Sequence, residues 1–154
     1  MKILVTGANG YLGQGIVKKL YEAGHNVIAT SLNINNITSD VEKIPVDLFS
    51  VDDPYNYFGK PDVVLHLALR DGFIHDSKAH VVDLPKHYEF LNKMVESGVS
   101  KVAVMGSMHE IGFYEGSIDS QTPCFPETPY GISKNALTWI IHRISKKQRN
   151  PTIH

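Results

Sequence analysis

The stretch Thr6-Gly7-Ala8-Asn9-Gly10-Tyr11-Leu12-Gly13 joins an apolar segment, residues 3–5, to a segment with helical periodicity. The pyrophosphate of a dinucleotide binds backbone N–H groups at a helix N-terminus, and a Cβ in the loop would block its approach. We expect Gly7 to allow the tight turn, Gly10 the close approach of the phosphates, and Gly13 the packing of helix on strand. A glycine-rich turn without a ligand is the alternative, and the strand before and the helix after the loop favour nucleotide binding.

Outward from this loop, apolar runs of strand length alternate with longer segments of helical period. The predicted strands are residues 3–5, 26–30, 43–46, 63–67 and 102–105, and we interpret His66 within the fourth as a core histidine. The predicted helices cover residues 12–21, 84–95 and 132–144, with Pro85 placed in the first turn of the second. This alternation predicts an α/β fold of the Rossmann type, a doubly wound parallel sheet whose strands are covered on both faces.

Composition narrows the class of protein. The chain has 154 residues, the size of one domain or of part of a larger one, and its net charge of −1 disfavours nucleic-acid binding through phosphate neutralisation. The single cysteine, Cys124, can form no internal disulfide, and no Cys/His spacing predicts a metal site. No apolar run reaches the roughly 18 residues of a membrane span and no signal peptide is recognisable, so we expect a cytoplasmic protein.

The adenosine end of the cofactor would meet the ends of the second and third strands. An acid at the end of the second strand binds the 2′-hydroxyl of NAD, but Ser31 occupies that place. No Arg or Lys between Ser31 and Asp40 is available for the 2′-phosphate of NADP, so NAD and NADP both stay open. Asp47 and Leu48 are candidates for binding the adenine amino group, with a helix cap as the alternative role of Asp47.

Tyr130 and Lys134 form a Tyr-x-x-x-Lys pair at the start of the third predicted helix, on one helix face. An ammonium near a phenol favours its ionised form, as a general acid/base acting on a sugar hydroxyl or carbonyl requires. Ser107 follows the fifth strand, where its hydroxyl could bind the substrate oxygen that Tyr130 protonates or deprotonates; a turn serine is the alternative. All three residues belong to the carboxyl edge of the sheet, where open parallel sheets place their catalytic groups.

Taken in order, these motifs resemble the extended short-chain dehydrogenase/reductase superfamily, in particular its NAD-dependent epimerase/dehydratase family, which acts on nucleotide sugars. The matching segments are residues 6–13, 47–48, 62–68, 107 and 129–134. The resemblance implies hydride transfer between a hexose carbon and NAD or NADP, with Ser107, Tyr130 and Lys134 catalytic and Lys134 also on the nicotinamide ribose. It implies cofactor contacts at Gly7, Asn9, Gly10, Tyr11, Leu12, Gly13, Ser31, Asp47, Leu48, Leu67 and Ala68.

Departures from the family pattern refine the expected reaction. Family members usually have Asn where this chain has Asp83, and an acid where it has Ser31. The 4,6-dehydratases carry an acidic pair directly after the residue that corresponds to Ser107, whereas Met108 and His109 stand here. Simple dehydration is therefore disfavoured, which leaves a nucleotide-sugar epimerase or a 4-keto-sugar reductase. His109 could donate a proton during epimerisation, with an exposed loop histidine as the alternative.

Members of this family are about twice as long, so the resemblance covers their cofactor-binding half and stops at residues 150–154, where a sixth strand should begin. We expect weak activity or none from such a truncated chain, because its substrate-binding walls would be missing. A nucleotide-sensing Rossmann module is the alternative from another class, and it would need the glycine loop but not Ser107, Tyr130 or Lys134. The resemblance also implies a possible homodimer, since many relatives dimerise through two helices. The apolar stripe from Ile132 to Ile144 is compatible with a homodimer and equally with simple packing on the sheet.

Overall fold

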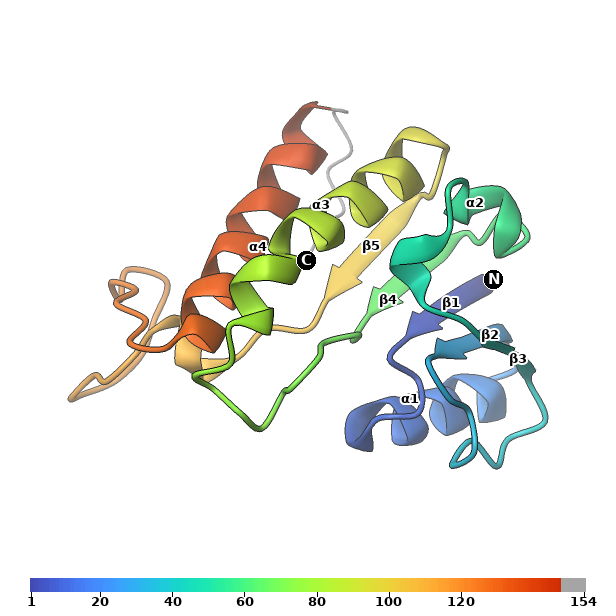
Figure 1. Ribbon diagram of the computed structural model, residues 1–154, viewed down its shortest axis with the longest axis horizontal. Helices are drawn as coiled ribbons and strands as arrows, with labels where there is room; N and C mark the ends of the chain where they lie inside the picture. Colours follow the sequence, from blue (N-terminus) through green and yellow to red (C-terminus); the bar gives the residue numbers. More distant parts are fainter. Residues whose placement is uncertain (148–154) are drawn as a thin grey trace.

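The computed structural model describes residues 1–147 as a parallel five-stranded sheet with helices on both faces (Figure 1). The strands are β1 (Lys2–Thr6), β2 (Asn26–Ser31), β3 (Glu42–Pro45), β4 (Val63–His66) and β5 (Lys101–Val104). Their order is β3-β2-β1-β4-β5, that of a doubly wound sheet up to its fifth strand. All five predicted strands are confirmed to within one residue at each end. The expected start of a sixth strand, residues 150–154, lies outside the described residues.

The register of the sheet brings the ends of its central strands to one edge. Thr6, the last residue of β1, pairs with Thr30 of β2 on one side and with His66 of β4 on the other. Since parallel strands run in the same direction, the segments that follow them leave the sheet side by side. The glycine loop, Ser31 and the residues after His66 therefore meet at the carboxyl edge.

The two faces of the sheet bury two separate sets of apolar side chains. Ile3 and Val5 pack with Val17 of α1 (Tyr11–Glu22), whereas Leu4 packs on the opposite face. That opposite face is covered by α3 (Ala79–Glu96) and α4 (Pro129–Lys147), which lie side by side in Figure 1. Alternate residues of β1 thus serve both cores, as expected for a strand buried on both faces.

Helix α3 begins earlier than its apolar spacing indicates. The prediction started this helix at Leu84 with Pro85 in the first turn, and it is wrong, because the helix starts at Ala79 and contains Pro85 in its interior. Proline has no N–H, so the carbonyl of Val81 loses its usual helical donor. Val81 and Pro85 are both exposed, which lets water satisfy that carbonyl.

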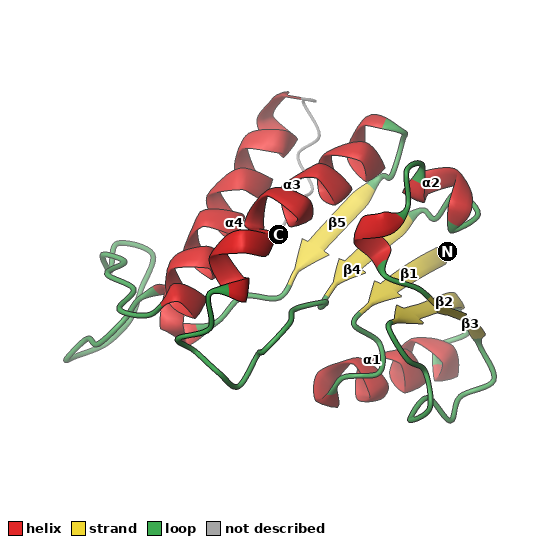
Figure 2. Ribbon diagram, viewed as in Figure 1, coloured by secondary structure: helices red, strands yellow, loops and turns green. Residues whose placement is uncertain are grey.

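Two connections carry most of the remaining chain. The segment between β3 and β4 holds a 3-10 turn, η1 (Leu48–Ser50), and a short helix, α2 (Pro54–Tyr57), which the sequence analysis did not predict. The long connection expected over residues 106–129 is a loop with one 3-10 turn, η2 (Met108–Glu110), and it extends away from the sheet in Figure 2. Across residues 1–147, no helix combines the length and apolar character that a membrane crossing needs.

Candidate functional site

The glycine loop is a tight turn in which side chains have no room. Gly7 has φ of +66°, and a Cβ placed on it would lie 2.7 Å from the backbone nitrogen of Ala68. A Cβ on Gly13 would overlap the carbonyl oxygen of Gly7, so α1 packs directly on the loop at this residue. The loop is closed by the Gly10 N–H, which donates to the Gly7 carbonyl at 3.0 Å. This geometry matches the roles of turn and packing expected for Gly7 and Gly13.

A cavity of about 340 Å³ opens beside the loop, at the carboxyl edge of the sheet. Its lining includes seven of the predicted cofactor residues, namely Gly7, Gly10, Ser31, Asp47, Leu48, Leu67 and Ala68. The other four loop residues lie elsewhere: the side chains of Tyr11 and Leu12 are exposed, Gly13 is buried beneath the loop, and Asn9 faces a neighbouring segment. The cavity runs from the glycine loop past the ends of β2 and β3 towards α3.

Asn9 ties the glycine loop to the segment after β2. Its side-chain carbonyl accepts a hydrogen bond from the backbone N–H of Asn36 at 2.8 Å, and its side-chain amide donates to Asn33. Ser31 therefore stands at the base of an anchored loop. Asp47 has the capping role considered for it as the alternative, because its carboxylate accepts from the Phe49 N–H at 3.0 Å. Asp47 also lines the cavity.

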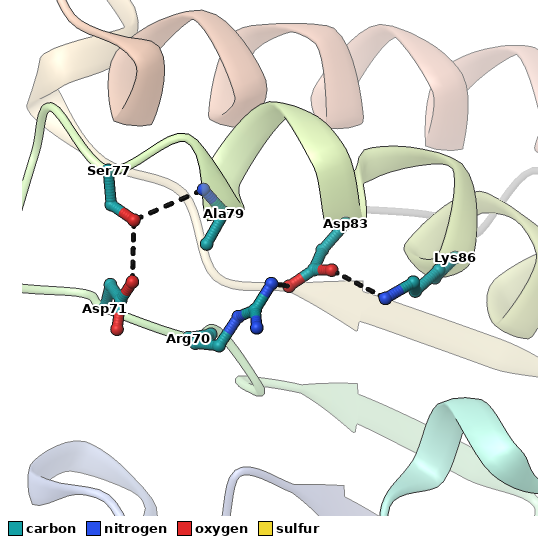
Figure 3. Close-up of polar contacts among 6 residues, drawn as sticks. All are labelled: Arg70, Asp71, Ser77, Ala79, Asp83 and Lys86. Carbon is teal, nitrogen blue, oxygen red and sulfur yellow. Dashed lines mark hydrogen bonds and ion pairs between the residues drawn. The ribbon is translucent and has the colours of Figure 1, made fainter.

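The far wall of the cavity carries a cluster of three charged side chains, which Figure 3 shows converging from α3 and the loop after β4. Asp83, one of the departures from the family pattern, is 5% exposed and lies 2.9 Å from both Arg70 Nη2 and Lys86 Nζ. Burial opposes ionisation of this carboxyl, but Lys86 and Arg70 outweigh it and hold the pKa of Asp83 below its usual range. The cluster has two cations and one carboxylate, so this wall has a net positive charge.

A buried pair of histidines lies next to this wall. His66 Nε2 is 2.8 Å from His87 Nδ1, and His66 Nδ1 is 2.9 Å from the hydroxyl of Thr6. Burial first, and then the nearby Lys134 ammonium, lower the pKa of His87 to about 4. Burial also holds the pKa of His66 well below its usual value, so both imidazoles are neutral near pH 7. His66 is a core histidine, as predicted, but its partner His87 also lines the cavity.

Tyr130 and Lys134 stand in the first two turns of α4, close to the end of β5. Lys134 is 5% exposed, and its Nζ donates to the carbonyl of Met105, just past β5, at 2.7 Å. Burial lowers the pKa of Lys134 from its usual value, against the opposing effect of the Glu110 carboxylate. The pair thus holds a desolvated ammonium one helical turn from a phenol.

Three histidines that the sequence analysis did not group together surround the Tyr130 ring. The centroid distances from Tyr130 are 5.0 Å to His75, which is stacked on it, 5.2 Å to His80 and 5.4 Å to His109. His75 comes from the loop before α3 and also accepts the Tyr130 N–H at its backbone carbonyl, at 3.0 Å. Their separation along the chain, about 55 residues from His75 to Tyr130, leaves no local signal of this contact.

Ser107 begins η2 as its N-cap. Its hydroxyl accepts from the His109 N–H at 3.3 Å, and its own N–H donates to the Glu110 carboxylate at 2.7 Å. This reciprocal capping fixes the turn beside Tyr130, and it leaves the hydroxyl hydrogen of Ser107 free to donate. The turn role considered for Ser107 is therefore present, and it is compatible with contact to a substrate oxygen.

Comparisons with known proteins agree with this architecture. A family model for the NAD dependent epimerase/dehydratase family matches residues 3–153. dTDP-6-deoxy-L-talose 4-dehydrogenase (NAD(+)) of Aggregatibacter actinomycetemcomitans is 40% identical over 142 residues, which cover 89% of this chain and 53% of that protein.

Solved structures give the same picture of the fold. The UDP-Glc/GlcNAc 4-epimerase of Campylobacter jejuni superposes with a TM-score of 0.86 at 18% identity, over 99% of this chain and 51% of that one. The UDP-glucuronic acid 4-epimerase of Bacillus cereus in complex with NAD gives a TM-score of 0.82 at 22% identity, over 99% and 55%. The chain therefore spans about half the length of the relatives it matches.

Proposed function

The chain belongs to the NAD-dependent epimerase/dehydratase family, and we propose that it forms the cofactor-binding and acid/base part of a nucleotide-sugar 4-dehydrogenase, or 4-keto-sugar reductase in the reverse direction. The observation that carries this proposal is the Tyr130–Lys134 pair at the carboxyl edge of the sheet, with the buried Lys134 ammonium held on the Met105 carbonyl. A sheet edge that only bound a nucleotide would have no chemical use for a phenol and an ammonium in this arrangement.

The residues present fit a dinucleotide. Gly7 and Gly10 present backbone without side chains to a cavity of about 340 Å³, at the N-terminus of α1. The absence of an Arg or Lys between Ser31 and Asp40 favours NAD over NADP, since a 2′-phosphate would find no cation on this segment. The printed name of the 40% identical relative also specifies NAD(+).

Each residue of the site has a separate task. The cofactor supplies the hydride acceptor or donor when bound. Tyr130 takes the proton from the sugar hydroxyl in oxidation and returns it in reduction, and Ser107 donates a hydrogen bond to the same oxygen. Lys134 holds its ammonium one helical turn from Tyr130 and would bind the nicotinamide ribose of the cofactor. Because Met108 and His109 replace the acidic pair of the dehydratases, the chain lacks the groups for eliminating water at this place.

A nucleotide-sugar 4-epimerase is the second candidate. The observation that favours it is the contact of His109 with Tyr130, at 5.4 Å between ring centroids, and with His75, at 4.2 Å. An imidazole beside the phenol offers a second group that can exchange a proton with the sugar. Production of a C4-inverted sugar without net NADH formation would select this candidate over the dehydrogenase.

Replacement of Tyr130 by Phe tests the proposed function. We would follow NADH formation from NAD⁺ and dTDP-6-deoxy-L-talose at 340 nm in the full-length protein, with NADH binding measured in parallel. The Tyr130→Phe variant should lower kcat by a factor of about 10² to 10⁴ and leave cofactor affinity unchanged. An unchanged rate would exclude Tyr130 as the acid/base, and cofactor binding with no turnover in the wild type would favour the nucleotide-sensing module.

A further inference from the structure

A row of three hydrogen-bonded side chains leads from the centre of the sheet to the cofactor cavity. It runs from the Thr6 hydroxyl to His66 at 2.9 Å, and from His66 to His87 at 2.8 Å. The three residues are 0%, 1% and 4% exposed, and His87 ends the row at the cavity wall. The other ring nitrogen of His87, Nε2, makes no hydrogen bond to any of the described residues. It is not sealed from solvent, and because His87 lines the cavity, Nε2 is open to the cavity.

The direction of the protons along this row follows from its first member. The Ala68 N–H already donates to Thr6 Oγ1 at 3.2 Å, so the Thr6 hydroxyl is free to donate its own hydrogen to His66 Nδ1. If His66 Nδ1–H donated to Thr6 instead, the Thr6 hydroxyl hydrogen would find no acceptor among the described residues. It would also find no water, because Thr6 is fully buried. His66 therefore carries its hydrogen on Nε2 and donates to His87 Nδ1. This leaves the hydrogen of His87 on Nε2, directed away from His66.

The surroundings of His87 suit a negatively charged ligand. Asp83 lies one turn before it on the same face of α3, and the Asp83 carboxylate binds both Lys86 and Arg70, which comes from the loop after β4. These two cations give the wall its positive charge. Phe49 packs against the His87 ring edge to face, with centroids 4.8 Å apart, and so holds the ring in place. Gly7 and Gly10, the expected phosphate-binding backbone, line the same cavity.

We propose that His87 contacts the bound dinucleotide directly, with its Nε2–H donating to a pyrophosphate oxygen opposite the glycine loop. The inference rests on the proposed function, because it requires a dinucleotide in the cavity. The row through His66 and Thr6 fixes the tautomer, so that His87 presents a donor and never an acceptor. The resemblance to known enzymes assigned no role to this residue.

His87 performs this task as a neutral group. The charges that face it are Lys134 from α4, Lys86 and Asp83 from α3, and Arg70 from the loop after β4, and its other neighbour is the neutral His66. Burial and the Lys134 charge keep its pKa at about 4, so its protonation state is constant between pH 6 and 8. In the free protein, His87 therefore offers its Nε2–H from a neutral ring.

A matched pair of variants separates the two ring nitrogens. His87→Asn keeps an acceptor near the Nδ1 position for His66 but removes the donor in the cavity. His87→Gln keeps a donor near the Nε2 position but loses the acceptor for His66. We expect the Kd for NADH, measured by fluorescence titration of the complete chain at pH 7, to rise about tenfold in His87→Asn and less than threefold in His87→Gln.

The outcomes distinguish this inference from the proposed function. Equal Kd values for wild type and His87→Asn, or a larger loss in His87→Gln, would overturn the inference and leave the function standing. Absence of NADH and NAD⁺ binding by the wild type would overturn both. If His87→Asn does not fold, ¹⁵N NMR of the wild type decides: an Nε2–H tautomer whose Nε2 signal shifts with cofactor supports the contact, and an Nδ1–H tautomer or an unmoved signal excludes it.

Discussion

Gly7 is the residue at which the backbone conformation of the glycine loop excludes a side chain most clearly. Its φ of +66° and the 2.7 Å approach of a Cβ to the Ala68 nitrogen leave no unstrained place for a side chain. Gly15, in α1, is the matched control, because a Cβ there would meet nothing within 4 Å. The two glycines lie in one loop-helix segment, but only Gly7 lacks the room and the backbone conformation for a side chain.

We predict opposite effects of alanine at these two positions. Gly7→Ala should lower the free energy of unfolding by about 2 kcal/mol through left-handed strain and the contact with Ala68. Gly15→Ala should raise it by roughly 0.5 to 1 kcal/mol, because alanine has the higher helix propensity. Urea unfolding of both variants measures the effect, and a Gly7→Ala protein as stable as the wild type would contradict the loop geometry.

The buried histidine pair predicts a loss of stability in mild acid. A histidine in the unfolded chain has a pKa of about 6.5, and that of His87 is about 4 in the folded protein. Between these pH values the unfolded chain binds the proton and the folded protein does not. The contribution of His87 to the free energy of unfolding is therefore fully present above pH 6.5 and is lost as the pH decreases towards 4. His87 alone should remove roughly 2 kcal/mol between pH 6.5 and 5, since one pKa unit equals about 1.4 kcal/mol.

Chemical unfolding at several pH values measures this slope. His87→Asn should lose a large part of it, because the substituted side chain does not titrate in this range. Identical slopes in the wild type and the variant would contradict the neutral, buried state of His87.

Site residues differ in how far the sequence predicts them. The glycine loop and the Tyr130–Lys134 pair are local patterns, since every member lies within about one or two helical turns of the next. The cluster of Arg70, Asp83 and Lys86 on the cavity wall was not predicted. The helical i, i+3 spacing of Asp83 and Lys86 could have indicated part of it. The pairing of His66 with His87 depends on how α3 packs on β4, and no spacing along the chain encodes that.

At the scale of elements, the strands were predictable and the start of α3 was not. Strands covered on both faces are continuous apolar runs, whereas residues 79–83 include His80 and Asp83, whose burial depends on partners elsewhere in the molecule. His80 donates from Nε2 to the Ile74 carbonyl at 3.0 Å, and Asp83 binds Arg70. These contacts extend the helix beyond the part that its apolar spacing indicates.

Pro85 inside α3 provides a test at this scale. Pro85→Ala should restore the hydrogen bond to the Val81 carbonyl and raise the free energy of unfolding by about 1 kcal/mol. The gain is smaller than the full cost of a helical proline because alanine leaves the unfolded chain more flexible. Thermal unfolding by circular dichroism measures it, and a decrease in Tm would show that the local helix geometry requires proline at this position.

At the scale of the whole molecule, the fold places the cavity and the Tyr130–Lys134 pair at the same edge of the sheet. The cavity is lined by Ser31 at the end of β2, by the segments that follow β1, β3 and β4, and by α3, whereas Tyr130 and Lys134 come from the helix that follows β5. Lys134 links the two parts, because its charge acts on both His66 and His87. The relatives that the chain matches are about twice its length.

The transfer of a labelled hydride tests the proposed function most directly. The full-length protein would be incubated with NAD⁺ and dTDP-6-deoxy-L-talose that carries deuterium at C4, and the nicotinamide would be analysed by mass spectrometry. A hydride-transferring enzyme of this kind should yield NADH with one deuterium, and the Tyr130→Phe variant should yield little or none. NADH without deuterium, or oxidation of the sugar with no label in the cofactor, would contradict the proposed reaction.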